Sequence, residues 1–146
     1  MHAQVKFSSV VGALSLLLMG VPVAAHHAFS AEFDENKPIA LLGTVSKVEW
    51  TNPHSWIHLN VKAPDGTVQE WMIEAGTPGT LLRRGMTKAA LPIGSEIKIT
   101  GYRARNDAYK ANGSEVVFAD GRTVFVGAEN TGAPYSPGIQ SVAPKK

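Results

Sequence analysis

The sequence contains no cysteine, which excludes disulfide bonds, iron–sulfur clusters and zinc sites built on thiolates. It also lacks a marked excess of either charge, because 14 Lys and Arg residues stand against 12 Asp and Glu residues. That balance does not favour nucleic acid as a partner, since nucleic-acid-binding proteins usually present a clustered basic face. No phosphate-binding Gly-rich loop, nucleophile elbow or metalloprotease motif occurs. The sequence therefore favours a binding protein over an enzyme.

No apolar run is long enough to cross a bilayer. The main apolar stretch, residues 7–21, has about 15 residues, short of the roughly 20 that a membrane-spanning helix needs. It follows Lys6 and precedes Val23 and Ala25, the small residues expected at positions −3 and −1 of a signal-peptide cleavage site. We therefore expect residues 1–25 to be a signal peptide. The mature protein is then periplasmic or secreted and has no membrane span.

The mature chain predicts an all-β domain with one helix. Pro64-Asp65-Gly66 predicts a tight hairpin turn between two strands. Thr77 is a candidate N-cap for a helix over residues 80–90, which Gly85 interrupts. Asn112-Gly113-Ser114 is assigned to a turn. Strands are expected over residues 39–50, 55–63, 68–74 and 96–102, with a fifth, at 115–119 and 123–126, folded as a hairpin.

Three strands, a helix and further strands follow the order of a small five-stranded Greek-key barrel of the OB type. A small antiparallel sandwich is the competing architecture. The expected organisation is an N-terminal segment at residues 26–38, the OB-like barrel at 39–127 and a flexible tail at 128–146.

The histidines of the expected mature chain fall into two pairs, His26-His27 and His54 with His58. After cleavage at Ala25, His26 carries a free α-amino group, whose pKa near 7.7–8.0 allows it to bind metal at neutral pH. Its amine and imidazole, with a third nitrogen from another histidine, form a T-shaped set known as a histidine brace, which suits Cu(II). Cleavage one residue earlier puts a histidine at position three, which is also a Cu(II)-chelating pattern.

The second pair cannot easily bind one ion together. His54 and His58 point to one face of an extended strand but lie roughly 13 Å apart along it. We expect one of them to join the N-terminal pair, so the candidate metal ligands are His26, His27, His54 and His58. The acidic stretch from Glu32 to Glu35 offers an oxygen ligand or an acceptor for a ligating histidine, or is simply solvated. Each histidine also has a structural interpretation, as a turn, packing or chain-end residue.

These ligands predict a protein that buffers copper or delivers it to another exported protein. A second hypothesis is a metal-free accessory module, in which Trp50, Asn52 and Trp56 hold a small molecule, a glycan or a protein. A copper oxidase or oxygenase is the third, although nothing around the histidines indicates a substrate pocket.

Several segments resemble a bacterial family of small exported proteins that is classed only as a domain of unknown function. The most specific are the His26-His27 start and the run Thr51-Asn52-Pro53-His54-Ser55-Trp56. Gly43-Thr44-Val45 and Asp120-Gly121-Arg122-Thr123 match as well. The resemblance implies an exported β-barrel module and brings no activity with it. Copper is inferred from the residues alone.

Overall fold

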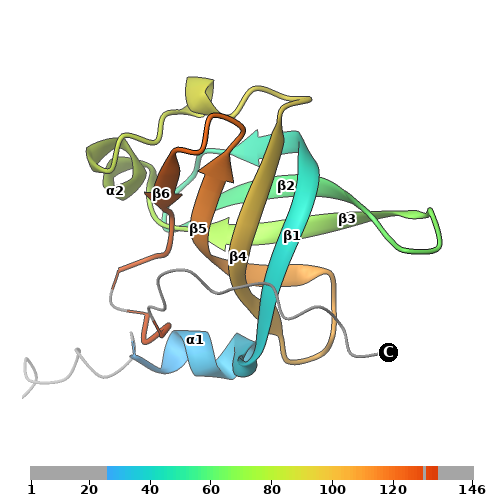
Figure 1. The fold of residues 1–146 in the computed structure, drawn as a ribbon. Coiled ribbons are helices and arrows are strands. Elements are labelled where there is room, and N and C mark those ends of the chain that lie inside the picture. The colour runs from blue at the N-terminus through green and yellow to red at the C-terminus, as the bar shows by residue number, and fades with distance from the viewer. Residues whose placement is uncertain (1–25, 130, 135–146) are drawn as a thin grey trace, which may run out of the picture.

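The structure, a computed structural model, describes residues 26–129 and 131–134. The expected signal peptide and most of the expected tail lie outside the described residues. The chain forms a short helix, a long strand, a hairpin, a second short helix, and then three more strands (Figure 1). The elements are α1 (His26–Glu32), β1 (Phe33–Glu49), β2 (Ser55–Lys62), β3 (Val68–Ala75), α2 (Pro78–Arg83), η1 (Lys88–Ala90), β4 (Glu96–Ala104), β5 (Lys110–Phe118) and β6 (Thr123–Phe125).

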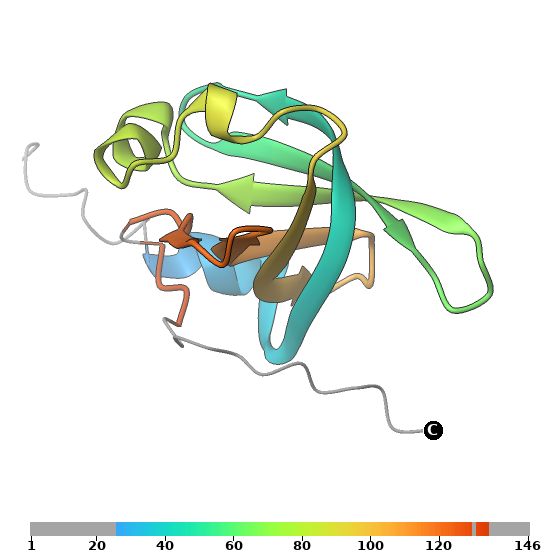
Figure 2. The same ribbon diagram turned by 45° about the horizontal axis from the view of Figure 1, so that its top comes forward.

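Five of the six strands close into a ring. The sheet order is β3-β2-β1-β4-β5-β6, and β3 also pairs with β5 in parallel through Met72 to Glu74. This last pairing joins β3, at one end of the sheet, to β5, so that β1 to β5 form a small barrel (Figure 2). The expected all-β class and small barrel are confirmed. The barrel has β6 as an additional strand on the edge of β5.

The barrel encloses the main hydrophobic core. Ile57 and Leu59 of β2 and Ile73 of β3 are completely buried, whereas Asn60 and Met72 on the opposite faces are exposed. This period-two alternation is the pattern that places one face of a strand in a core. The hairpin between β2 and β3 turns at Gly66, as the sequence predicts, with a positive φ of 86°.

The expected N-terminal segment, residues 26–38, contains a helix and the start of the first strand. Residues 26–32 form α1, and β1 begins at Phe33 instead of residue 39. The reason is a second hydrophobic cluster outside the main core, formed by Phe29, Phe33, Tyr102 and Ala104. The ring of Phe29 lies edge-on to that of Tyr102 at 5.6 Å, so α1 is fixed against β4.

Two other expectations were wrong in detail. The helix after β3 ends at Arg83 rather than residue 90, because Gly85 has a φ of 79° and leaves the helical conformation. The segment Asn112-Gly113-Ser114, expected as a turn, lies inside β5. Gly113 is there because a side chain would meet Ile73 of β3 at 2.9 Å, so strand packing and not a turn requires it.

The helices lie at different ends of the barrel. α1 is at one end, and η1 and α2 are at the other (Figure 1). Residues just beyond β6 return to α1, where the Phe29 amide donates to the carbonyl of Thr131. The beginning of the expected tail is therefore docked. None of the helices in the described part of the chain is long and apolar enough to cross a membrane.

Candidate functional site

A pocket of about 200 Å³ lies between α1 and the barrel. Its apolar wall comes from Phe29 and Phe33, and its polar wall comes from Glu32, His54 and Glu74. Thr131 also lines it. The pocket therefore combines one imidazole and two carboxylates with an apolar surround.

The segment before β2 fixes the position of His54. The peptide bond between Asn52 and Pro53 is cis. The hydroxyl of Thr51 donates to the carbonyl of His54 at 3.0 Å, and the amide of Ser55 donates to the carbonyl of Gly76 at 3.1 Å. His54 thus sits on a backbone held from both sides, at the point where β2 begins.

His54 faces the carboxylate of Glu74. Its Nδ1 is buried and lies 3.1 Å from Oε1 of Glu74, although within the described residues this nitrogen makes no aligned hydrogen bond. The His54 side chain is 31% exposed and that of Glu74 only 10%. With Nδ1 next to the carboxylate, Nε2 is the nitrogen left for an external ligand.

Glu74 is held in turn from the neighbouring strand. Asn112 of β5 donates its Nδ2 to Oε1 of Glu74 at 3.3 Å, and the Oδ1 of Asn112 is buried without a partner among the described residues. Burial raises the pKa of Glu74, and the charge of Glu32 raises it further, whereas His54, Lys110 and the Asn112 hydrogen bond act against the rise. The carboxyl group therefore accepts a proton more readily than an exposed glutamate.

A lysine completes the electrostatic surroundings. Lys110, at the start of β5, pairs with Glu32 of α1, and its ammonium lies 4.8 Å from the centre of the Trp56 ring. This cation–π contact covers one aromatic side chain of the loop that the sequence singled out. Lys110 therefore links α1, β2 and β5 beside the pocket.

His58 lies in a separate group. Its Nε2 is 3.0 Å from Oε1 of Glu49, and its Nδ1 is 3.7 Å from Oε1 of Glu70. Lys47 also pairs with Glu49 at 2.6 Å, and this is the main reason that the pKa of Glu49 is lowered. The structure thus gives His54 and His58 different carboxylate partners and does not bring them to one site.

The N-terminal histidines begin the helix that borders the pocket. His26 and His27 are the first residues of α1, and Phe29 of the same helix lines the pocket with His54. A helix rises about 1.5 Å per residue, so the backbone of His26 is only about 4.5 Å along the axis from that of Phe29. Residues 29–129 and 131–134, whose side chains the structure describes, contain no group of three or more metal-binding side chains placed to hold one ion.

The aromatic loop does not form one open surface. Trp50 packs against the main core, Trp56 is covered by Lys110, and Asn52 is exposed. Sequence reasoning missed Glu74, Asn112 and Lys110. The hairpin register offered a signal for Glu74, because a turn at residues 64–66 pairs Lys62 with Val68 and hence Trp56 with Glu74.

Comparison with known proteins gives a family and no activity. The model of a family of unknown function, DUF6152, matches residues 14–114, and the chain belongs to this family. No curated protein matches the chain, and no solved structure does. The small all-β barrel is therefore shown by the structure, and its more specific assignment to the OB-fold stays a prediction.

Proposed function

We propose that this protein is exported and binds one copper ion through His26, His27 and His54, in order to buffer the metal or pass it to another exported protein. The amine and imidazole of His26 supply two nitrogens, His54 supplies the third through Nε2, and His27 is available as a further ligand. His58 is left out because carboxylates face both of its nitrogens.

One observation carries the proposal. His54 lines the same pocket as Phe29, which is less than one helical turn from the residue that becomes the N-terminus after cleavage at Ala25. Phe29 lies 25 positions before His54 in the chain, so only the fold brings these two residues to one pocket. A third nitrogen is what an N-terminal histidine lacks for a tetragonal Cu(II) site.

The surroundings of His54 support the same function. A metal-binding histidine usually presents its second ring nitrogen to a carboxylate, which fixes the ring and raises its basicity. Glu74 stands in that place at 3.1 Å from Nδ1. Its own position is fixed by Asn112. Phe29 and Phe33 give the pocket an apolar wall beside these polar groups.

The proposal is tested on protein recovered after export from its natural signal. We expect native mass spectrometry to show a chain that begins at His26 and takes up one copper ion. A chain that keeps residues 1–25 after export, or a correctly processed chain that takes up no copper, would contradict it. In the second case the loop of Trp50, Asn52 and Trp56 becomes the place to search for a ligand.

A further inference from the structure

A second pocket, of about 310 Å³, lies next to the first. Its walls are the end of α1, the end of β4 and the loop that leads to β5. Glu32 lines both pockets. The lining residues are Ala31, Glu32, Ala104, Arg105, Asn106 and Lys110.

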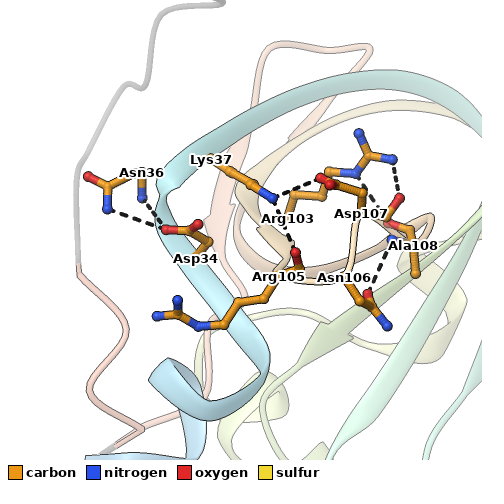
Figure 3. A network of polar contacts seen from close by, with 8 residues as sticks. All are labelled: Asp34, Asn36, Lys37, Arg103, Arg105, Asn106, Asp107 and Ala108. Carbon is orange, nitrogen blue, oxygen red and sulfur yellow. Dashed lines mark hydrogen bonds and ion pairs between the residues drawn. The ribbon is translucent and has the colours of Figure 1, made fainter.

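The loop at this pocket is held in place by its own contacts (Figure 3). Lys37 of β1 donates to the carbonyl of Arg105 at 3.2 Å and pairs with Asp107 at 2.8 Å. Arg103 donates to the carbonyls of Asp107 and Ala108. The loop therefore has a defined shape before any ligand arrives, and this lowers the entropic cost of binding.

Polar donors at the pocket remain unused. Arg105 donates through Nε to the carbonyl of Ser30 at 2.6 Å, and its outer N–H groups make no hydrogen bond within the described residues. The nearby carboxylate of Asp34 interacts with Arg105 through its charge, and it accepts a hydrogen bond from the amide of Asn36 at 3.0 Å (Figure 3). Asn106 uses its Oδ1 to accept from the Ala108 amide, which leaves its Nδ2 without a partner in the described chain.

The charge at the pocket suits an anion. Arg105 and Lys110 are cationic, and Glu32 is the one acid among the lining residues, so the lining carries a net positive charge. Lys110 already pairs with a carboxylate at this place, that of Glu32. The planar fork of the Arg105 guanidinium matches the two oxygens of a carboxylate.

We propose that this second pocket binds a small carboxylate-bearing anion, with one carboxylate on the outer N–H groups of Arg105 and the Nδ2 of Asn106, and a second group competing with Glu32 for Lys110. The proposal does not depend on copper binding, because none of the three donors is a proposed copper ligand.

The test is an NMR titration of the metal-free protein with succinate at low ionic strength, repeated with inorganic phosphate. We expect saturable shifts at the side-chain N–H groups of Arg105 and Asn106. Arg105→Gln should weaken succinate binding about tenfold, the effect of losing one charged hydrogen-bonded contact. Glu32→Gln should strengthen it, because the internal competitor for Lys110 is removed. Because the two substitutions should change succinate affinity in opposite directions, a general loss of structure could not produce both results.

Arg122→Gln is the matched control, since Arg122 lies in the turn between β5 and β6, away from the pocket. Succinate affinity lowered by Arg105→Gln, raised by Glu32→Gln and unchanged by Arg122→Gln supports the proposal. Absence of saturable shifts, or an equal loss in both arginine variants, overturns it. Phosphate binding in place of succinate overturns the assignment to a carboxylate.

Discussion

The Nδ1 of His54 lies 3.1 Å from the Oε1 of Glu74, on the wall of a pocket that α1 closes from the other side. His54 immediately precedes β2 and Glu74 lies in the neighbouring strand β3, 20 positions further along the chain. A histidine in this position has one nitrogen beside a carboxylate and one left for a ligand. This relationship is the basis of the proposed copper site and of three of the predictions below.

The two loop histidines should differ sharply in copper binding. His54→Ala removes a proposed ligand, so we expect the Cu(II) affinity of the mature protein to fall more than about 100-fold, beyond the usual effect of a residue that only supports a ligand. His58→Ala is the control, because its partners are Glu49 and Glu70. Competition with a chromophoric Cu(II) chelator measures both. Equal losses in the two variants would remove His54 from its assigned role.

Glu74 should support the site without binding the metal. Glu74→Ala leaves His54 without its carboxylate, and we expect a loss of about 10–100-fold in Cu(II) affinity. Glu74→Gln keeps an acceptor and should recover part of that loss. Electron spin-echo spectroscopy of the remote imidazole nitrogen reports the change in hydrogen bonding directly. Glu70→Ala, an exposed position on the same strand, should leave both affinity and spectrum unchanged; an equal effect there would refute a specific role for Glu74.

The raised pKa of Glu74 predicts a pH-dependent stability of the metal-free protein. Between the ordinary glutamate value of about 4.3 and the raised folded value, the folded state holds a proton that the unfolded state has lost. The free energy of unfolding therefore falls as the pH rises through this window. Glu74→Gln stays neutral and should be more stable than the wild type above the window and similar below it.

Urea unfolding at pH values from 4 to 8 measures this difference. Glu70→Gln serves as the control, because it makes the same substitution on the same strand at a side chain that is 66% exposed. A constant offset between the wild type and Glu74→Gln at every pH would show that the carboxyl group does not titrate differently in the two states.

The fold was partly accessible from the sequence. The alternation of residues 55–63 and the turn at Gly66 specified the β2–β3 hairpin, because both are local signals. The parallel pairing of β3 with β5 was not accessible, since it joins residues far apart and has no local pattern. That pairing is what brings Asn112 to Glu74, so the residue that holds Glu74 in place could not be predicted.

The helix α1 shows a second limit. Its seven residues are too few to give a clear helical period, and its stability comes from the contact of Phe29 and Phe33 with Tyr102 on β4. Residue types pointed to His26, His27 and His54 as a set. The pocket beside α1 came only from the packing.

One glycine should be essential for the pairing of β4 with β5. A Cβ on Gly101 of β4 would lie 2.1 Å from the carbonyl oxygen of Asn112, at the position where the β4–β5 register shifts. Gly101→Ala should therefore lower the free energy of unfolding by at least about 3 kcal/mol. Gly66→Ala, in an open turn with a φ of 86°, should cost only about 1 kcal/mol. Urea unfolding of the two variants checks the contrast, which similar losses would contradict.

The central claim depends on a free amine at His26, and one comparison tests it most directly. Cu(II) is titrated into the mature protein that begins at His26 and into the same protein with one additional N-terminal glycine. The account predicts tight one-to-one binding by the first and a large loss of affinity in the second, because the glycine moves the amine away from the His26 imidazole. Equal affinity in the two proteins would contradict the N-terminal site and place any copper ligands elsewhere in the chain.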